Sequence, residues 1–362
     1  ATPLFIVTFC ELMDWLGTPA LFDELFPAVE AALHWIDHYA DHNGDGFVDY
    51  GKVSPRGLEH QNWKDSHNSL LFPDGSEPVP PIAAVEVQGY VFQAKRMLAA
   101  VLQRFGGNTR QMLVARLRAE AEQLRERFER FFWNEAEHFY GQAIDGRGRL
   151  VTAISSNPGH CLWSEIVSPA RAAQLVERLF QPDLYSGWGI RTLARGMPHY
   201  NPMSYHNGSI WPHDNALIVA GLRRYGFDRQ ALQLVSDLLE VATSFPYYRL
   251  PELFCGFGRD EAECMVPISY PVSCSPQAWA AGTMPFLLRI VLGAEARAAE
   301  RRLTLRPAFP QWLNEVELEG VSFAGSRIDL AVRRHNGRYL LEVECDPDIT
   351  VVLAAASAEP RR

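Results

Sequence analysis

Two carboxylates, Asp65 and Glu252, stand in segments where aromatic and amide side chains gather. Asp65 is preceded by Gln61-Asn62-Trp63-Lys64, and Glu252 lies in Arg249-Leu250-Pro251-Glu252-Leu253-Phe254. Aromatic rings stack on sugar faces, and two carboxylates on either side of a sugar are the minimum equipment for glycoside hydrolysis. We therefore predict that folding brings the two together, with Asp65 as general acid and Glu252 as general base.

Each carboxylate also has a plain structural interpretation. Asp65 followed by Ser66 is typical of a helix N-cap or a turn. The pair Pro251-Glu252 suits the first turn of a helix, where the positive end of the dipole favours a carboxylate. In the functional interpretation Trp63 and Lys64 hold Asp65 in a partly dry pocket, because desolvation keeps a carboxyl protonated near neutral pH. The residues alone leave both interpretations open.

A third segment, residues 200–215, is unusually rich in Tyr, His, Asn, Trp and Asp for a loop. Such side chains stack on a pyranose ring and exchange hydrogen bonds with its hydroxyls. A metal site built from His206, His213 and Asp214 is the alternative, but their spacing matches no standard motif.

Two further metal patterns are weak. Residues 41–49 resemble the start of a calcium loop, but position twelve is Lys52 rather than a bidentate Glu. His34, His38 and His42 share a helix face, which is more typical of a solvated surface than of zinc binding. We expect no cofactor and no catalytic metal, and a structural calcium at 41–49 stays open.

Composition narrows the class of protein. The chain has 362 residues, 47% of them apolar, with 34 Lys and Arg against 43 Asp and Glu for a net charge of −9. This balance disfavours nucleic acid and anionic membranes as partners. No apolar run approaches the roughly 20 residues that span a bilayer, and residues 1–7 lack the basic region of a signal peptide. The 6 cysteines form no CxxC pair, so we expect reduced thiols in a cytoplasmic protein.

Helical periodicity dominates the first 295 residues. It predicts helices at 4–15, 20–42, 81–105, 109–133, 157–166, 168 onward, 212–225, 228–243 and 276–292, with a short hairpin at 137–152. Long loops at 43–80, 182–210 and 244–275 hold the segments described above. Alternating apolar and polar residues from 303 to 353 predict a small antiparallel β unit. We therefore expect two domains, 1–295 and 296–362.

Several motifs resemble the bacterial amylo-alpha-1,6-glucosidase group, which is related to the glucosidase domain of glycogen debranching enzyme. The resemblance covers nearly the whole chain. Its motifs are Ala1 to Phe5, Asp45-Gly46-Phe47-Val48-Asp49-Tyr50, Gln61 to Ser66, Val85-Glu86-Val87-Gln88-Gly89-Tyr90, Ser186 to Thr192, Asn201 to Asn215, Leu250 to Leu253 and Ser275-Pro276-Gln277-Ala278-Trp279.

The resemblance implies a mainly α chain folded as an (α/α)6 toroid, like glucoamylase and trehalase, that acts by inversion. It places the acid at Asp65 and the base at Glu252. Glu86 is either a further subsite acid or a buried structural residue. The residues that it marks for substrate binding are Trp63, Lys64, Trp188, Tyr205, His206, Asn207, Trp211, Asp214 and Gln277.

The chain departs from this family in its helix count. About nine helices are predicted, whereas a ring of six hairpins needs twelve. The toroid is therefore expected to be incomplete at its N-terminal side, with apolar helix faces exposed at the edge. A missing N-terminal segment, a partner chain or self-association would cover them.

The leading hypothesis is an inverting glycoside hydrolase on α-glucosidic linkages of an oligosaccharide or glucan, of the amylo-alpha-1,6-glucosidase type. The alternative is a non-catalytic carbohydrate-binding or assembly fragment of a larger glycosidase, which the short helix count favours. A toroid sugar epimerase ranks last, because only His206 and His213 provide the paired histidine bases that such enzymes use.

Overall fold

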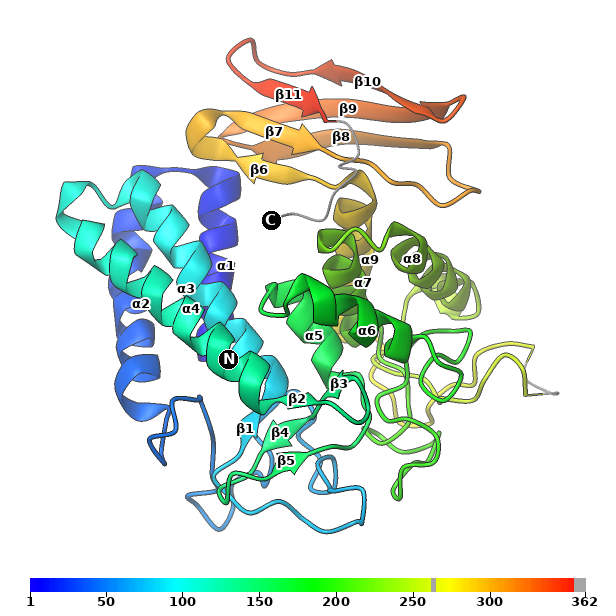
Figure 1. The fold of residues 1–362 in the computed structure, drawn as a ribbon. Helices are drawn as coiled ribbons and strands as arrows, with labels where there is room; N and C mark the ends of the chain where they lie inside the picture. The colour runs from blue at the N-terminus through cyan, green and yellow to red at the C-terminus, as the bar shows by residue number, and fades with distance from the viewer. Residues whose placement is uncertain (262–264, 355–362) are drawn as a thin grey trace.

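The computed structural model describes residues 1–261 and 265–354. Within these ranges, nine α-helices are followed by a β-rich unit (Figure 1). The helices are α1 (Thr2–Leu16), α2 (Pro19–Tyr39), α3 (Val85–Phe105), α4 (Gln111–Phe131), α5 (Asn157–Ser164), α6 (Pro169–Leu179), α7 (Pro212–Arg224), α8 (Asp228–Thr243) and α9 (Ala278–Leu292). The prediction of a mainly α chain is confirmed.

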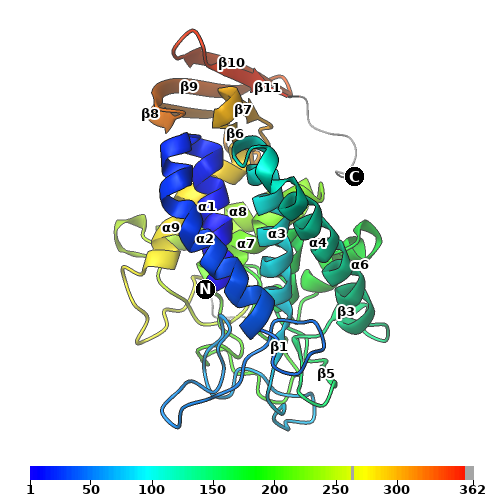
Figure 2. The ribbon, with the colours of Figure 1, turned by 90° about the vertical axis from the view of Figure 1, so that its left-hand side faces the viewer.

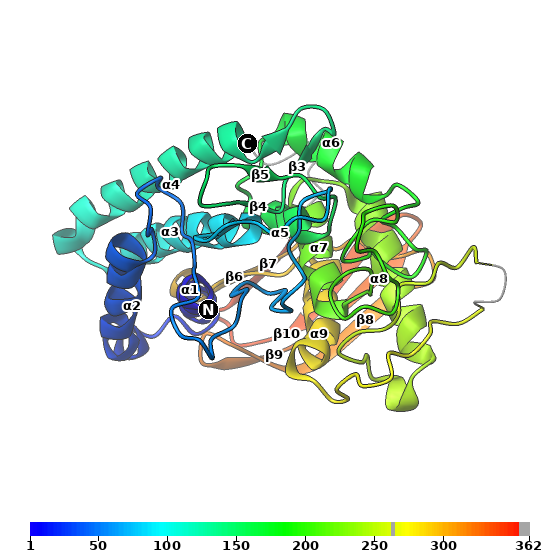
Figure 3. The same cartoon turned by 90° about the horizontal axis from the view of Figure 1, so that it is seen from below.

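The helices form two layers. Each odd-numbered helix contacts the next odd-numbered one, so that α1, α3, α5, α7 and α9 make an inner row. Each even-numbered helix packs on the odd-numbered helix before it and lies farther out (Figure 3). At the ends of the row, Arg289 of α9 and Glu11 of α1 form an ion pair of 2.8 Å. Closure into a six-hairpin toroid remains a prediction.

Glycines let the inner helices approach closely. A Cβ on Gly221 of α7 would lie 2.5 Å from Cβ of Leu162 in α5, and one on Gly159 of α5 would lie 2.6 Å from the Ile218 side chain of α7. Atoms do not pack at such distances, so these positions accept no side chain without a backbone shift. The α5–α7 crossing therefore depends on both glycines.

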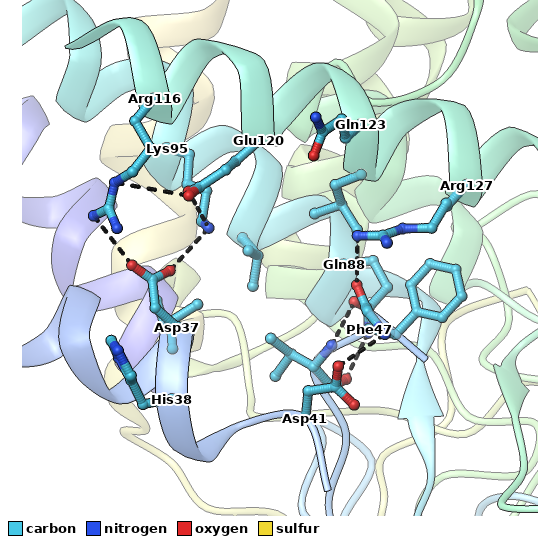
Figure 4. Close-up of a pocket in the computed structure, with 15 residues that line it drawn as sticks. Asp37, His38, Asp41, Phe47, Gln88, Lys95, Arg116, Glu120, Gln123 and Arg127 are labelled. Carbon is cyan, nitrogen blue, oxygen red and sulfur yellow. Dashed lines mark hydrogen bonds and ion pairs between the residues drawn. The ribbon is translucent and has the colours of Figure 1, made fainter. Parts of the chain in front are cut away.

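Four charged side chains join three helices across a groove with a volume of about 340 Å³ (Figure 4). Nζ of Lys95 in α3 lies 3.0 Å from Asp37 of α2 and 2.7 Å from Glu120 of α4. Arg116 of α4 contacts the same two carboxylates at 3.2 and 3.7 Å. Each charge faces an opposite charge, which offsets much of the cost of their partial burial. The network holds α2, α3 and α4 together.

Short strands support the long loops. β1 (Ala83–Ala84), β4 (Ala143–Ile144) and β5 (Leu150–Val151) form one sheet, and β2 (Trp133–Asn134) pairs with β3 (Phe139–Tyr140). β4 and β5 are antiparallel, so the predicted hairpin at 137–152 is present. The first sheet ties the end of the 43–80 loop to the chain after α4.

The β unit has two three-stranded sheets. β8 (Glu315–Phe323), β9 (Ser326–His335) and β10 (Arg338–Glu344) are antiparallel, while β6 (Glu295–Arg297), β7 (Arg302–Leu305) and β11 (Thr350–Leu353) form the other sheet. β11 runs parallel to β7, so the prediction of a wholly antiparallel unit is wrong. The unit lies over the ends of α1 and α9 (Figure 2), where Ala324 N–H donates to the carbonyl of Trp15 at 2.9 Å.

Sequence periodicity predicted most elements and misjudged some ends. The helix expected from residue 81 begins at Val85, because residues 83–84 pair as a strand instead. The helix expected to reach residue 42 ends at Tyr39.

Among the residues described, Cys10, Cys161, Cys255, Cys274 and Cys345 are free, and Cys264 lies outside them. The described helices are all too short or too polar to cross a bilayer.

Replacing Gly221 with Ala should destabilise the protein, because the new methyl group collides with the backbone and Cβ of α5. We expect a loss of about 2 kcal/mol in the free energy of unfolding, measured by urea denaturation. Gly282→Ala in α9 is the matched control, since a Cβ there meets no described atom within 4 Å. It should stabilise the protein by up to about 1 kcal/mol through helix propensity. Equal effects of the two substitutions would contradict the role of Gly221.

Candidate active site

Asp65 lies between two anchored neighbours. Nζ of Lys64 donates to the carbonyl oxygen of Thr192 at 2.6 Å, and the side chain is almost completely buried. Oγ of Ser66 lies 2.7 Å from Nδ1 of His206. Because both neighbours are tied to the interior, Asp65 itself is left exposed. The partly dry pocket expected around Asp65 is therefore absent from the described part of the chain.

Glu252 is held by the segments on either side of it. It lies in a loop and not at a helix start, and only 7% of its surface is exposed. The Tyr205 hydroxyl donates to Oε1 at 2.6 Å, and the Cys274 backbone N–H donates to Oε2 at 3.0 Å. Ile210 and Phe254 exchange backbone hydrogen bonds of 2.9 and 3.0 Å, which sets this loop beside the 200–211 segment.

Tyr205 is the common neighbour of the two carboxylates. Its pKa is raised by burial, by the hydrogen bond to Glu252 and by the negative charges of Glu252 and Asp65. His206 follows Tyr205 in the chain and lies 2.7 Å from Oγ of Ser66, so the segments of Asp65 and Tyr205 are in contact. That the two carboxyl groups face one sugar stays a prediction.

An aromatic cluster surrounds Trp63. Its ring centroid lies 5.2 to 5.8 Å from the rings of His160, His206, Trp211 and His213. Nε1 of Trp63, Nε2 of His206 and both ring nitrogens of His213 are buried and have no hydrogen-bond partner among the described residues. Buried polar atoms are normally hydrogen-bonded, so this group marks a place where water or a polar ligand belongs.

Trp63 stacks on His160, which belongs to a buried network of polar side chains. Nδ1 of His160 is 2.6 Å from the Tyr90 hydroxyl, and its Nε2 is 2.7 Å from Oδ1 of Asp214. Glu86 accepts a hydrogen bond of 3.1 Å from Asn157 and has no exposed surface, which favours its structural interpretation. Burial raises the pKa of Glu86. Glu86 and Asp214 stand in the first turns of α3 and α7, where the helix dipole favours negative charge.

Some residues predicted to bind substrate have partners within the chain, and their role in binding stays a prediction. Trp188 is 2% exposed, and the Arg259 guanidinium covers its ring at 3.6 Å. Oε1 of Gln277 accepts the Ala280 N–H at 3.0 Å as the N-cap of α9. Four more of these residues are buried and hydrogen-bonded within the chain. Lys64 bonds to Thr192, Asn207 to the Asn68 carbonyl, Trp211 to the Tyr205 carbonyl and Asp214 to His160.

The sequence analysis assigned no role to four residues that contact the cluster around Trp63 or Glu252. They are Tyr90, His160 and Trp279, which join the cluster through ring contacts, and Cys274, which bonds to Glu252. The signal for Trp279 was present, since it stands two residues after Gln277 in the same motif. Nothing local in the sequence distinguishes His160, which lies in a short buried helix and joins the site only through contacts with distant residues.

The metal patterns take other forms in the structure. The Asp41 carboxylate accepts backbone N–H groups of Gly44 and Gly46, as a turn does, and His42 contacts Asp49. Nowhere in residues 1–261 and 265–354 do three or more His, Cys, Asp or Glu side chains group as metal ligands would. The 340 Å³ groove between α2 and α4 shares no described residue with the cluster around Trp63.

Comparisons with known proteins place the chain among glycoside hydrolases. The model of the mannosylglycerate hydrolase MGH1-like glycoside hydrolase domain matches residues 2–248, and the chain belongs to this family. Asp65 lies inside the match, and Glu252 lies just beyond its end. No curated protein matches the sequence. The amylo-alpha-1,6-glucosidase resemblance is thus supported only at the level of a glycosidase family.

Solved structures share the fold at low identity. A GH78 rhamnosidase of Bacillus sp. GL1 has 18% identity and a TM-score of 0.68 over 98% of this chain. A sialidase has 13% identity and a TM-score of 0.67 over 92% of it. The chain spans only 33% and 30% of those two proteins. A GH63 mannosylglycerate hydrolase from Thermus thermophilus has 14% identity and a TM-score of 0.59. The matched region is 79% of this chain and 76% of the hydrolase chain.

The pKa of His206 gives a testable pH dependence. Burial, helped by the charge of Lys64, lowers it from the usual 6.5 to about 3. The folded state keeps this histidine neutral below pH 6.5 while the unfolded chain takes up a proton, so stability falls as the pH falls towards 3. The destabilisation caused by His206→Gln should therefore shrink by about 2 kcal/mol between pH 7 and pH 5, measured by urea unfolding. A cost that does not change with pH would contradict this assignment.

Proposed function

We propose that the chain is an inverting glycoside hydrolase in which Asp65 protonates the leaving oxygen and Glu252 activates the attacking water. One observation carries the proposal: Tyr205 binds Glu252 at 2.6 Å, and the adjacent His206 lies 2.7 Å from Ser66, which follows Asp65. Asp65 is open to a ligand, and a bound sugar would desolvate its carboxyl and favour the protonated form that a general acid needs. A carboxylate with fixed hydrogen bonds can orient a water molecule.

The family resemblance in the sequence supports inversion over retention. Inverting enzymes keep their carboxyl groups roughly 6.5–9.5 Å apart to leave room for the water, whereas retaining enzymes need about 5–5.5 Å. Here the hydroxyl of Tyr205 takes one oxygen of Glu252, and the backbone of Cys274 takes the other. Neither of these contacts with Glu252 involves Asp65. Both oxygens of Glu252 are thus held in place, as is needed for a base that orients a water molecule.

The aromatic cluster supports a sugar as the substrate. Trp63 and Tyr205 are half-buried, so part of each ring is available for stacking on C–H groups of a pyranose. The nitrogens of Trp63, His206 and His213 that have no partner in the described chain offer hydrogen bonds to hydroxyls. The finer specificity that we propose is for α-glucosidic linkages, with amylo-alpha-1,6 activity as its narrowest form. The family resemblance in the sequence supports this choice.

A non-catalytic carbohydrate-binding fragment is the second candidate. The chain spans about a third of the rhamnosidase that it resembles in fold. In addition, Phe5 in α1 is 43% exposed, and an exposed aromatic ring on an inner helix suits a surface that another segment covers. Such a fragment would bind oligosaccharides without releasing glucose.

Removing either carboxylate should nearly abolish hydrolysis. We expect Asp65→Asn and Glu252→Gln each to lower kcat by at least about 10³-fold on a panel of α-glucosides and α-mannosides, because proton transfer in the transition state is lost. Release of reducing sugar measures the effect. Asp74→Asn, which changes an exposed residue of the same long loop as Asp65, should retain full activity. Near-normal turnover by either catalytic variant would refute the assignment.

The stereochemical outcome provides an independent test. Proton NMR of the first minutes of turnover should show the β-anomer released from an α-glucoside, because water attacks from the face opposite the leaving group. The α-anomer as the first product would show retention and exclude Glu252 as a general base. No product with any substrate, together with measurable sugar binding, would favour the non-catalytic fragment.

A further inference from the structure

Trp279 is an aromatic residue that no role described above uses. It stands in the first turn of α9 and is 47% exposed, yet its ring centroid lies only 4.1 Å from that of His213. His213 in turn contacts Trp63 at 5.2 Å and Trp211 at 5.5 Å. Trp279 thus joins the cluster by one edge and leaves much of its ring open.

The surface beside Trp279 is kept free by small residues. Ala278, Ala281 and Gly282 are exposed, and a Cβ on Gly282 would meet no described atom within 4 Å. A helical side chain leans over the preceding turn, so a large residue at position 282 would lie over Trp279. The Gln277 cap fixes the start of α9 and therefore the point from which the indole emerges.

His213 provides hydrogen-bonding groups beside Trp279. Both of its ring nitrogens are buried without a partner in the part of the chain that the structure describes. Burial lowers its pKa well below the usual value, so the ring is neutral and offers one donor and one acceptor. A hydroxyl both accepts and donates and so satisfies such a ring, whereas a carboxylate only accepts. An indole face next to such a histidine fits a pyranose, which has C–H groups on one face and hydroxyls at its rim.

Intervening aromatic rings separate Trp279 from Glu252. Ring contacts lead from Trp279 to His213, then Trp211 at 5.5 Å, then Tyr205 at 4.9 Å, and of these rings it is Tyr205 that binds Glu252. A sugar stacked on Trp279 would therefore lie beside a sugar held next to Glu252.

We propose that Trp279 and His213 form a subsite for a second pyranose, adjacent to the one that is cleaved. The ligand is then an α-linked oligosaccharide of at least two neutral sugar units. The assignment of the neighbouring unit as the cleaved one rests on the proposed function, whereas the binding role of Trp279 does not.

Calorimetric titration of Glu252→Gln protein, which the proposed mechanism makes inactive, tests the subsite. The probes are maltotriose, isomaltotriose and α-linked mannotriose, with glucose and mannose as single units. Adding Trp279→Ala should weaken the binding of the preferred trisaccharide about tenfold, since one aromatic stacking contact is lost. The weakening for the single sugar should be smaller, and Trp279→Phe should restore part of the affinity.

Two more variants make the test independent of the Trp279 truncation. Gly282→Leu should also weaken trisaccharide binding, because its side chain would cover the indole while every native contact stays in place. Trp35→Ala removes a similarly exposed tryptophan, 41% exposed on α2, and should change nothing. Circular dichroism and thermal unfolding establish that each variant is folded.

The results separate this inference from the proposed function. Trisaccharide binding that depends on Trp279 and Gly282 supports the subsite, even if the wild-type protein releases no sugar and the hydrolase proposal fails. Hydrolysis by the wild type, with Trp279 and Gly282 variants that bind like Trp35→Ala, overturns the subsite and leaves the hydrolase proposal intact. Failure of all three trisaccharides to bind also overturns the subsite.

Discussion

The buried ammonium of Lys64 donates to the carbonyl oxygen of Thr192 at 2.6 Å, and the positions of the other site residues depend on this contact. The Thr192 backbone N–H donates to the carbonyl oxygen of Ser209 at 2.9 Å, and its hydroxyl accepts the Gly208 N–H at 2.9 Å. One residue thus joins the segment that ends in Asp65 to the segment that begins with Tyr205. Glu252 follows, because its loop pairs with the latter segment and bonds to Tyr205.

Burying a lysine is costly, and the surrounding charges offset part of that cost. Burial lowers the pKa of Lys64 to about 8, against the opposing influence of Asp214 and Glu86, so the side chain is still mainly charged at pH 7. Those two carboxylates are in turn stabilised at the first turns of their helices. The site therefore contains buried charges of opposite sign on Lys64, Asp214 and Glu86. Loss of the lysine would leave the two carboxylates buried without its positive charge. This group of charges holds Trp63 and its neighbours in a single arrangement.

The elements were largely predictable from the sequence, and the roles of single residues were not. Helix and strand periods are local properties, so most helices and the β unit from 303 to 353 were predicted, apart from the ends of the helices. Composition also located the segments around Asp65, Tyr205 and Glu252. Yet Trp188 and Gln277 carried the same compositional signal as Trp63, and in the structure Trp188 packs under Arg259 and Gln277 caps α9. Whether an aromatic or amide side chain meets a ligand depends on distant residues, here Arg259 for Trp188, which no local pattern contains.

By itself the sequence determined a mainly α chain with a β-rich end, a net negative charge and two carboxylates in sugar-compatible surroundings. These follow from residue types and from periods of a few residues. Only the tertiary structure decided that Asp65 is exposed, that Glu252 is held from two sides, that β11 runs parallel to β7 and that Trp279 is open beside His213. Each of these is set by contacts between residues far apart in the chain, whose geometry exists only after the helices have packed.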